Sequence, residues 1–80
     1  MTFDVTEKKL MSKKAAEHHK KASEHFTHAA HHYEEAAKHG EAGNHERAAH
    51  HNEIAHAHVI DAREQVQEAR KAYAKDHGKK

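Results

Sequence analysis

The 80-residue sequence contains no cysteine, no proline and no tryptophan, and it has only three glycines. Without cysteine the chain has no disulfide, no thiolate zinc site, no iron–sulfur cluster and no cysteine nucleophile. Without proline, and with so little glycine, almost nothing interrupts a helix. Because only two Phe and two Tyr are present, any core must be built largely from small side chains.

Long apolar runs are also missing. No segment is apolar enough to span a bilayer, and the first 14 residues contain no apolar stretch of the kind found in signal peptides. The net charge is only +1 with neutral histidines, which does not favour nucleic-acid binding driven by charge. We therefore expect a cytoplasmic protein without a membrane or nucleic-acid partner.

Histidine is the abundant residue, with 13 copies dispersed along the chain. Protonating all 13 would raise the net charge from +1 by 13 units, mostly in mildly acidic conditions, because unperturbed histidine titrates near pH ~6.5. The rest is dominated by alanine, glutamate, lysine, glutamine and arginine, which are strong helix formers. The composition predicts an all-α protein of one domain, residues 1–80.

Capping residues predict where the first of two helices begins. Asp4 followed by Glu7 matches a capping box, and Ser12 is a second possible N-cap, so the first helix should begin near Val5 or Lys13. We expect it to continue to about Lys38.

The segment 39–44 predicts a turn between the helices. Gly40 is suited to the left-handed residue that ends a helix, and Asn44 is suited to the N-cap of the next one. The second helix should cover about 45–76. A connection this short makes the two helices antiparallel neighbours, so the expected fold is a two-helix hairpin.

Both expected helices share a seven-residue repeat. Alanine recurs at every seventh position, histidine often follows three residues later, and an apolar residue often follows four residues later. Seven residues are close to two helical turns, so each set forms a stripe along one face. The alanine stripes are Ala15, Ala22, Ala29 and Ala36 in the first helix and Ala48, Ala55, Ala62 and Ala69 in the second.

Facing alanine stripes set the register of the hairpin. If Ala29 lies level with Ala55, the histidine stripes of the two helices come to matching heights on one side. The apolar residues come to the other side, where a lone hairpin would leave them exposed, so we predict a homodimer, as a four-helix bundle. These apolar residues are Phe26, Tyr33, Val59, Val66 and Tyr73.

The histidine side predicts metal ligands. His28 and His32 are four residues apart on one helix face, and the register brings His51 to the same level, which gives three ligands and one open position. His25 and His58 would form a second, weaker site about 10 Å further along the axis. Imidazole is a common ligand for Ni, Zn, Cu(II) and Co, so we predict non-enzymatic buffering or sequestration of such an ion.

Two alternatives to metal binding come from the same residues. Protonation of matched histidines would place like charges side by side, which suits a pH-responsive interaction or structural module. A diiron carboxylate enzyme needs paired Glu-x-x-His motifs, whereas only Glu53 and His56 have that spacing. Ser12 and Ser23 lack a strained turn or oxyanion donors around them, so the sequence does not predict an enzyme.

Repeated Ala-Ala-His-His and Glu-x-Ala-Ala segments, as at 29–32 and 48–51, run through 15–80. In this the chain resembles small histidine-rich helical-hairpin proteins found in bacterial genomes. The resemblance implies a hairpin and carries no established activity with it.

Overall fold

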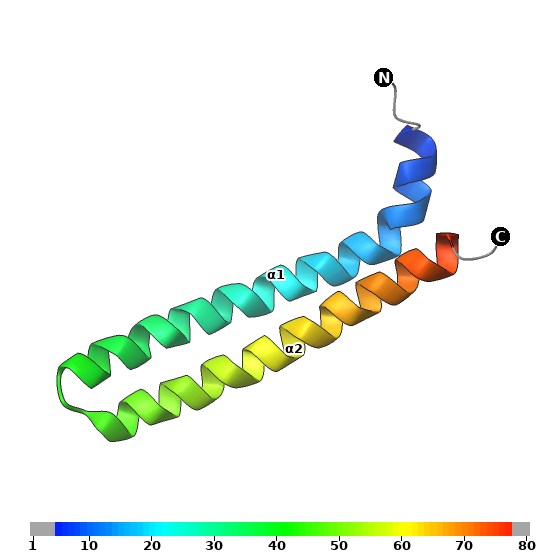
Figure 1. Ribbon diagram of the computed structural model, residues 1–80. Coiled ribbons are helices and arrows are strands. Elements are labelled where there is room, and N and C mark those ends of the chain that lie inside the picture. The colour runs from blue at the N-terminus through cyan, green and yellow to red at the C-terminus, as the bar shows by residue number, and fades with distance from the viewer. Residues whose placement is uncertain (1–4, 78–80) are drawn as a thin grey trace.

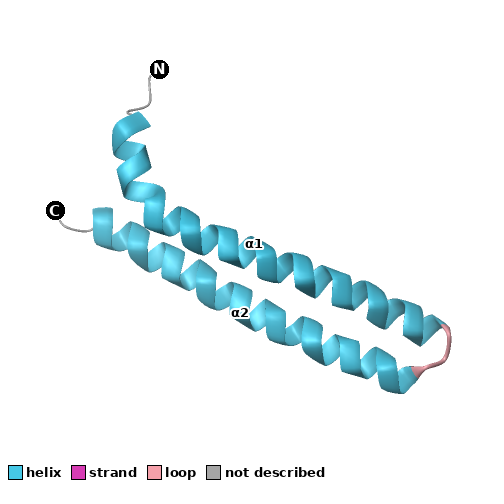
Figure 2. Cartoon of the chain, turned by 180° about the vertical axis from the view of Figure 1, so that it is seen from behind, coloured by secondary structure: helices cyan, strands magenta, loops and turns pink. Residues whose placement is uncertain are grey.

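The computed structural model describes residues 5–77, with side chains for 13–75, and it consists of two helices. Helix α1 spans Val5–Glu41 and helix α2 spans His45–His77. Figure 1 shows the two lying antiparallel, while the first turns of α1, in blue, lean away from α2. The reverse view in Figure 2 shows that only the turn between the helices departs from helix in the described chain. The structure confirms an all-α, two-helix hairpin.

The ends of the helices differ in part from the predicted boundaries. Helix α1 begins at Val5, so Ser12 lies inside the helix and is not an N-cap, while Asp4 lies outside the described residues. Its end at Glu41 lies three residues beyond the predicted Lys38. The helix continues through Gly40 because one glycine costs only about 1 kcal/mol relative to alanine.

Gly43, rather than the predicted Gly40, ends helix α1. Gly43 has a φ of +82°, the left-handed conformation that favours glycine. The Asn44 N–H donates to the His39 carbonyl at 2.8 Å, and the Gly43 N–H donates to the Gly40 carbonyl at 3.0 Å. These two bonds make a Schellman motif, which satisfies two carbonyls that the helix end would leave unpaired.

Asn44 caps helix α2, as the sequence predicts. Its Oδ1 accepts a hydrogen bond of 3.2 Å from the Arg47 N–H, and its carbonyl accepts one of 3.1 Å from the Ala48 N–H. The first bond is the usual N-cap interaction, and the second begins the helical ladder. One asparagine therefore closes the end of α1 and opens α2, which keeps the turn short and the helices antiparallel.

Alanine fills the seam between the helices. Among residues 13–75 the buried residues are all alanines of the predicted stripes, and Ala55 and Ala62 are 0% exposed, whereas Ala36 and Ala48, near the turn, are half-buried. Methyl side chains allow the helices to lie close together, but each contributes little apolar burial. The packing confirms the predicted seven-residue register. The buried set is Ala15, Ala22, Ala29, Ala55, Ala62 and Ala69.

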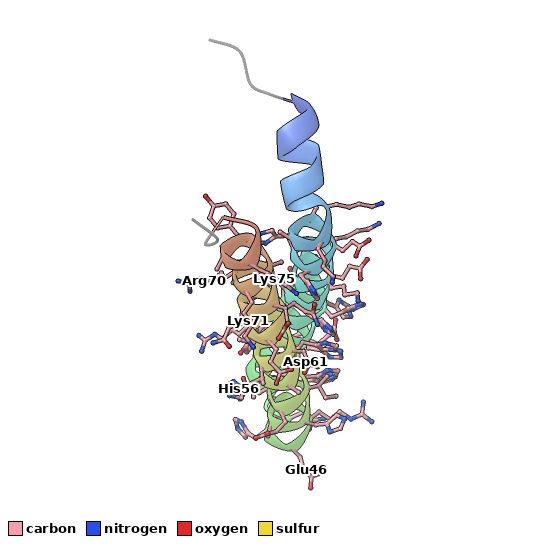
Figure 3. The ribbon with its side chains drawn as sticks, turned by 90° about the vertical axis from the view of Figure 1, so that its right-hand side faces the viewer. Glu46, His56, Asp61, Arg70, Lys71 and Lys75 are labelled. Atoms are coloured by element: carbon pink, nitrogen blue, oxygen red, sulfur yellow. The ribbon has the colours of Figure 1, made fainter. Side chains whose placement is uncertain are left out.

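The hairpin is a thin rod, with extents of 56 × 24 × 15 Å. Figure 3 views it nearly end-on and shows side chains projecting from both sides of the paired helices. Across the described helices, no stretch is both long enough and apolar enough to cross a membrane.

Candidate metal centre

Polar side chains from the two helices meet along one side of the hairpin, which we call the histidine side. The contacts occur at one-heptad intervals, where each partner lies three residues after an alanine of the predicted stripes. They are His32 Nδ1 to His51 Nδ1 at 3.0 Å, His25 Nδ1 to His58 Nδ1 at 3.2 Å and His18 Nδ1 to Gln65 Oε1 at 2.7 Å. The predicted matching of the two histidine stripes is therefore confirmed in space.

Each histidine pair can share a single proton. In His25–His58 and in His32–His51 the two Nδ1 atoms face each other at hydrogen-bond distance. One Nδ1 must carry the proton and donate it, and the other must accept with its lone pair. The two rings of each neutral pair are thus different tautomers, and two N–H groups must face each other only when both rings are imidazolium.

The rings also stack into a row that runs along the hairpin. The His58 ring centroid lies 5.2 Å from that of His28 and 5.9 Å from that of His32. The His51 ring lies 5.2 Å from His32 and 5.3 Å from His39. His32 therefore contacts the rings of both His51 and His58. The row of rings is continuous from the middle of the hairpin to the turn.

One cluster of possible metal ligands lies at the middle of the hairpin. His25, His58 and Asp61, which we call the central group, each offer a ligand atom, and these atoms lie within 4.8 Å of one another. The two histidines are half-buried and the aspartate is exposed. Asp61 comes one turn after His58 on α2, so its carboxylate reaches the same side of the helix.

A second cluster lies beside the turn. Glu35, His39 and His51, which we call the turn group, meet the same 4.8 Å limit, and all three are half-buried. The Glu35 carboxylate also pairs with Lys38 at 3.7 Å. Lys38 would compete only weakly with a metal ion for the Glu35 carboxylate, because the lysine is largely exposed and surface ion pairs contribute little.

Both groups have the same chemical composition, two imidazoles and one carboxylate. In each group the imidazoles come from different helices, so both ligand sets depend on the hairpin fold. Nitrogen and oxygen ligands of this kind suit Zn, Ni, Co and Cu(II).

The folded environment favours the neutral form of two rings. The pKa of His32 is lowered from its ordinary value, first by loss of hydration and then by repulsion from His51, His31 and His28, while Glu35 acts in the opposite direction. A neutral ring keeps the lone pair that a metal ion requires.

The same balance applies to His58. Its pKa is also lowered, chiefly by loss of hydration, then by His28, His25 and His32, and Asp61 partly opposes this shift. Both affected rings lie inside the row of imidazoles, where a positive charge has other ionisable rings as neighbours.

Three of the five predicted ligands belong to the two groups, whereas His28 and His32 belong to neither. His25 and His58 meet as expected and are joined by Asp61, whereas His51 belongs to the turn group. His28 stacks on His58, and His32 contacts His51 and His58. The trio His28, His32 and His51 is not one of the two ligand groups formed by the described residues, and as a metal site it stays a prediction.

Three possible ligands were not predicted as such, namely Asp61, Glu35 and His39. Their signal in the sequence is local spacing. Asp61 follows His58 by three residues, and His39 follows Glu35 by four, and both spacings place side chains on one helix face. His39 also continues the histidine stripe of α1.

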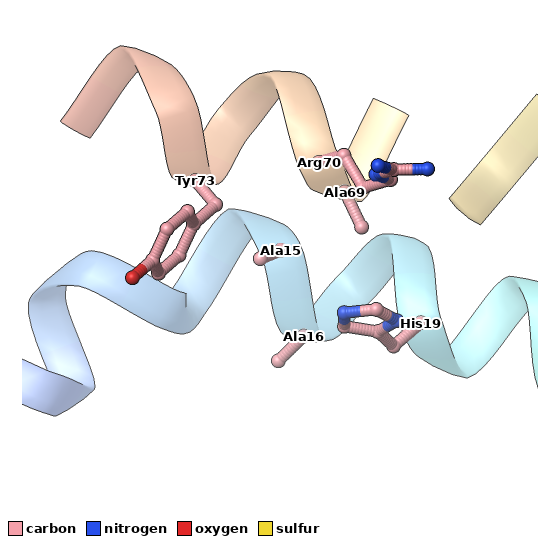
Figure 4. Close-up of a pocket in the computed structure, with 6 residues that line it drawn as sticks. All are labelled: Ala15, Ala16, His19, Ala69, Arg70 and Tyr73. Atoms are coloured by element: carbon pink, nitrogen blue, oxygen red, sulfur yellow. The ribbon is translucent and has the colours of Figure 1, made fainter. Parts of the chain in front are cut away.

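Two grooves open on the opposite side of the seam. One has a volume of about 420 Å³ and is lined by Ala15, Ala16, His19, Ala69, Arg70 and Tyr73. Figure 4 shows the Tyr73 ring reaching from α2 towards α1 at the end of this groove. A second groove, of about 500 Å³, includes Phe26 and Val66 and so joins apolar residues of both helices, as the register predicts.

Comparison of the chain with protein-family models, with curated proteins and with solved structures finds no match.

Proposed function

We propose that this protein binds divalent transition-metal ions at the histidine side and acts, without catalysis, as a metal buffer or sequestering protein. The supporting observation is the central group, in which imidazoles of two helices face each other at 3.2 Å beside a carboxylate. The turn group offers a second set of the same composition.

The spacing of the central pair suits a metal ion. Zn–N bonds of about 2.0–2.1 Å place two ligands of a tetrahedral ion about 3.3 Å apart. The Nδ1 atoms of His25 and His58 lie 3.2 Å apart, so an ion can replace the shared proton with little movement of the helices. The ring that carries the proton on Nδ1 would move it to Nε2, which leaves the ligand neutral.

Three protein ligands leave a tetrahedral ion with one open position. An ion held in this way, on a side of the hairpin that is only half-buried, can exchange with other ligands, as a buffer requires. The described grooves lie on the opposite side of the seam, so neither places a substrate next to the ion.

The candidate ions are Ni, Zn, Co and Cu(II). Intrinsic affinity for nitrogen and oxygen ligands rises from Co to Ni to Cu(II) and then falls at Zn, so Cu(II) should bind most tightly in vitro. Which ion is bound in the cell depends on availability as well as on this order.

Isothermal titration of chelator-treated protein with each of the four ions tests the proposal. We expect binding at micromolar concentration or tighter, with at least about tenfold loss at the central group in His25→Ala, since even outer-shell changes cost 10–100-fold. His56→Ala is the matched control, because it removes one exposed histidine that belongs to neither group. Absence of binding for all four ions would contradict the proposal.

We also propose that the protein is a homodimer, as a four-helix bundle. On the apolar side, Phe26 lines the groove that contains Val66 and is 45% exposed, and Tyr33 is 42% exposed. A seam made only of alanine stabilises a small chain weakly, and a second copy would add larger side chains to the core. A two-fold dimer through this side would leave both histidine sides outward.

A further inference from the structure

His32 belongs to neither ligand group, yet it contacts one ligand of each. Its Nδ1 lies 3.0 Å from His51 Nδ1, and its ring lies 5.9 Å from that of His58 with only 12° between the planes. The turn group contains His51, and the central group contains His58. His32 is itself half-buried, so its own position is restricted.

Towards the turn group, His32 acts through a hydrogen bond. The bond engages the Nδ1 of His51 and leaves its Nε2 for an ion. Metal-bound histidines commonly donate their other N–H to a neighbouring acceptor, which fixes the tautomer and the orientation of the ring. A neutral His32 with its proton on Nε2 supplies such an acceptor at Nδ1.

Towards the central group, His32 acts through ring packing. The His58 ring is stacked on both His28 and His32, with 29° and 12° between the respective planes. These two ring contacts limit rotation of the His58 ring, whose Nδ1 faces His25 at 3.2 Å. Loss of His32 would remove one of the two contacts.

We infer that His32 is a positioning residue shared by the two groups, and that through it the groups bind two ions with positive cooperativity. The inference rests on the proposed metal binding. An ion at either group fixes a ring that His32 contacts, so the first ion orders His32 and lowers the ordering cost of the second. Repulsion between the ions is reduced because each group contributes a carboxylate.

Substitutions at His32 that each keep one of its two contacts provide the test. His32→Ala removes both contacts, His32→Asn keeps a hydrogen-bonding side chain without the aromatic ring, and His32→Phe keeps a ring without the hydrogen bond. Each is titrated with Zn²⁺ in the full chain, and also with Asp61→Asn or Glu35→Gln, which isolate the turn group and the central group respectively. His56→Ala is the matched control, since it removes an exposed histidine that belongs to neither group.

We expect His32→Ala to weaken both groups by about 10–100-fold and to abolish the cooperativity. His32→Asn should restore part of the affinity of the turn group alone, and His32→Phe part of that of the central group alone. A general loss of structure would not separate the two groups in this way. Circular dichroism should show equal helix content for all of the variants, and His56→Ala should bind as the unmodified protein does.

Three results would overturn the inference while leaving metal binding intact. These are affinities within about twofold of the unmodified protein in His32→Ala, a loss at one group only, or a ¹⁵N shift showing that His32 itself binds the ion. If the unmodified protein binds no Zn²⁺, the inference is overturned, and the proposed function fails with it only if Ni, Co and Cu(II) are not bound either.

Discussion

At the scale of single residues, the facing Nδ1 atoms decide how this surface responds to protons. A pair such as His25 and His58 shares one proton between its rings, and under the proposed metal binding an ion would compete for the same lone pairs. Once both rings are imidazolium, the contact becomes repulsive. The histidine side is therefore more stable in its neutral form and is weakened by acid.

The lowered pKa values of His32 and His58 predict that the metal-free protein loses stability in mild acid. In the unfolded chain both rings titrate near pH ~6.5, whereas in the folded chain they titrate lower. Between these values the unfolded state binds more protons, so the free energy of unfolding falls as the pH falls below about 6.5 and is fully regained above it. Thermal unfolding of chelator-treated protein from pH 7.5 to pH 5 measures this slope.

The double variant His32→Gln/His58→Gln should lose less stability between pH 7.5 and pH 5 than the unmodified protein, because its two glutamine side chains do not titrate. The control His45→Gln/His56→Gln removes two exposed histidines and should keep the original slope. Equal slopes in all three proteins would show that the paired rings do not govern acid sensitivity. They would also remove the basis for a pH-responsive role.

At the scale of secondary-structure elements, the two glycines near the turn have opposite roles. Gly43 is left-handed and closes the Schellman motif, whereas Gly40 lies in the last turn of α1. A Cβ added at either position meets nothing within 4 Å, so only backbone conformation distinguishes them.

Gly43→Ala should lower the free energy of unfolding by about 1–2 kcal/mol, the cost of a left-handed residue with a Cβ. Gly40→Ala should instead raise it by about 0.5–1 kcal/mol, because alanine is the better helix former. Urea denaturation of the two variants beside the unmodified protein gives both values. Destabilisation of equal size at both positions would contradict the assignment of the helix end.

How far the sequence predicts the structure also becomes clear at this scale. The pairing of His25 with His58 followed from spacing, because seven-residue stripes and a short turn leave one register. The glycine that ends α1 could not be chosen from the sequence, since either Gly40 or Gly43 could supply the left-handed residue at a helix end. Asp61 and Glu35 were not identified as ligands, because their spacing on a helix is equally typical of a solvated side chain.

At the scale of the whole molecule, the core contributes little apolar burial. Among residues 13–75, the six buried side chains are all methyl groups, and the larger apolar side chains stay at least partly exposed. The hairpin is therefore held by close backbone approach, capped ends and the contacts of the histidine side. Larger apolar burial would have to come from a second copy.

The proposed dimer predicts that two similarly exposed apolar positions respond differently to substitution. Phe26 lies on the apolar side at 45% exposure, whereas Ile60 is 47% exposed but lies two residues before Ala62, on the face turned away from the seam. Phe26→Glu should lower the mass measured by sedimentation from that of two chains to that of one, because a dimer of this variant would have to bury a charge in its interface. Ile60→Glu should leave the dimer intact.

Sedimentation with and without chelator separates this association from cross-linking of chains by metal ions at the histidine sides. If the apolar side forms the interface, the dimer persists after metal removal, and Phe26→Glu also lowers the unfolding temperature, since the isolated hairpin keeps only its alanine seam. A monomeric unmodified protein at high micromolar concentration would exclude the bundle. It would leave the central and turn groups unaffected, because each draws its ligands from a single hairpin.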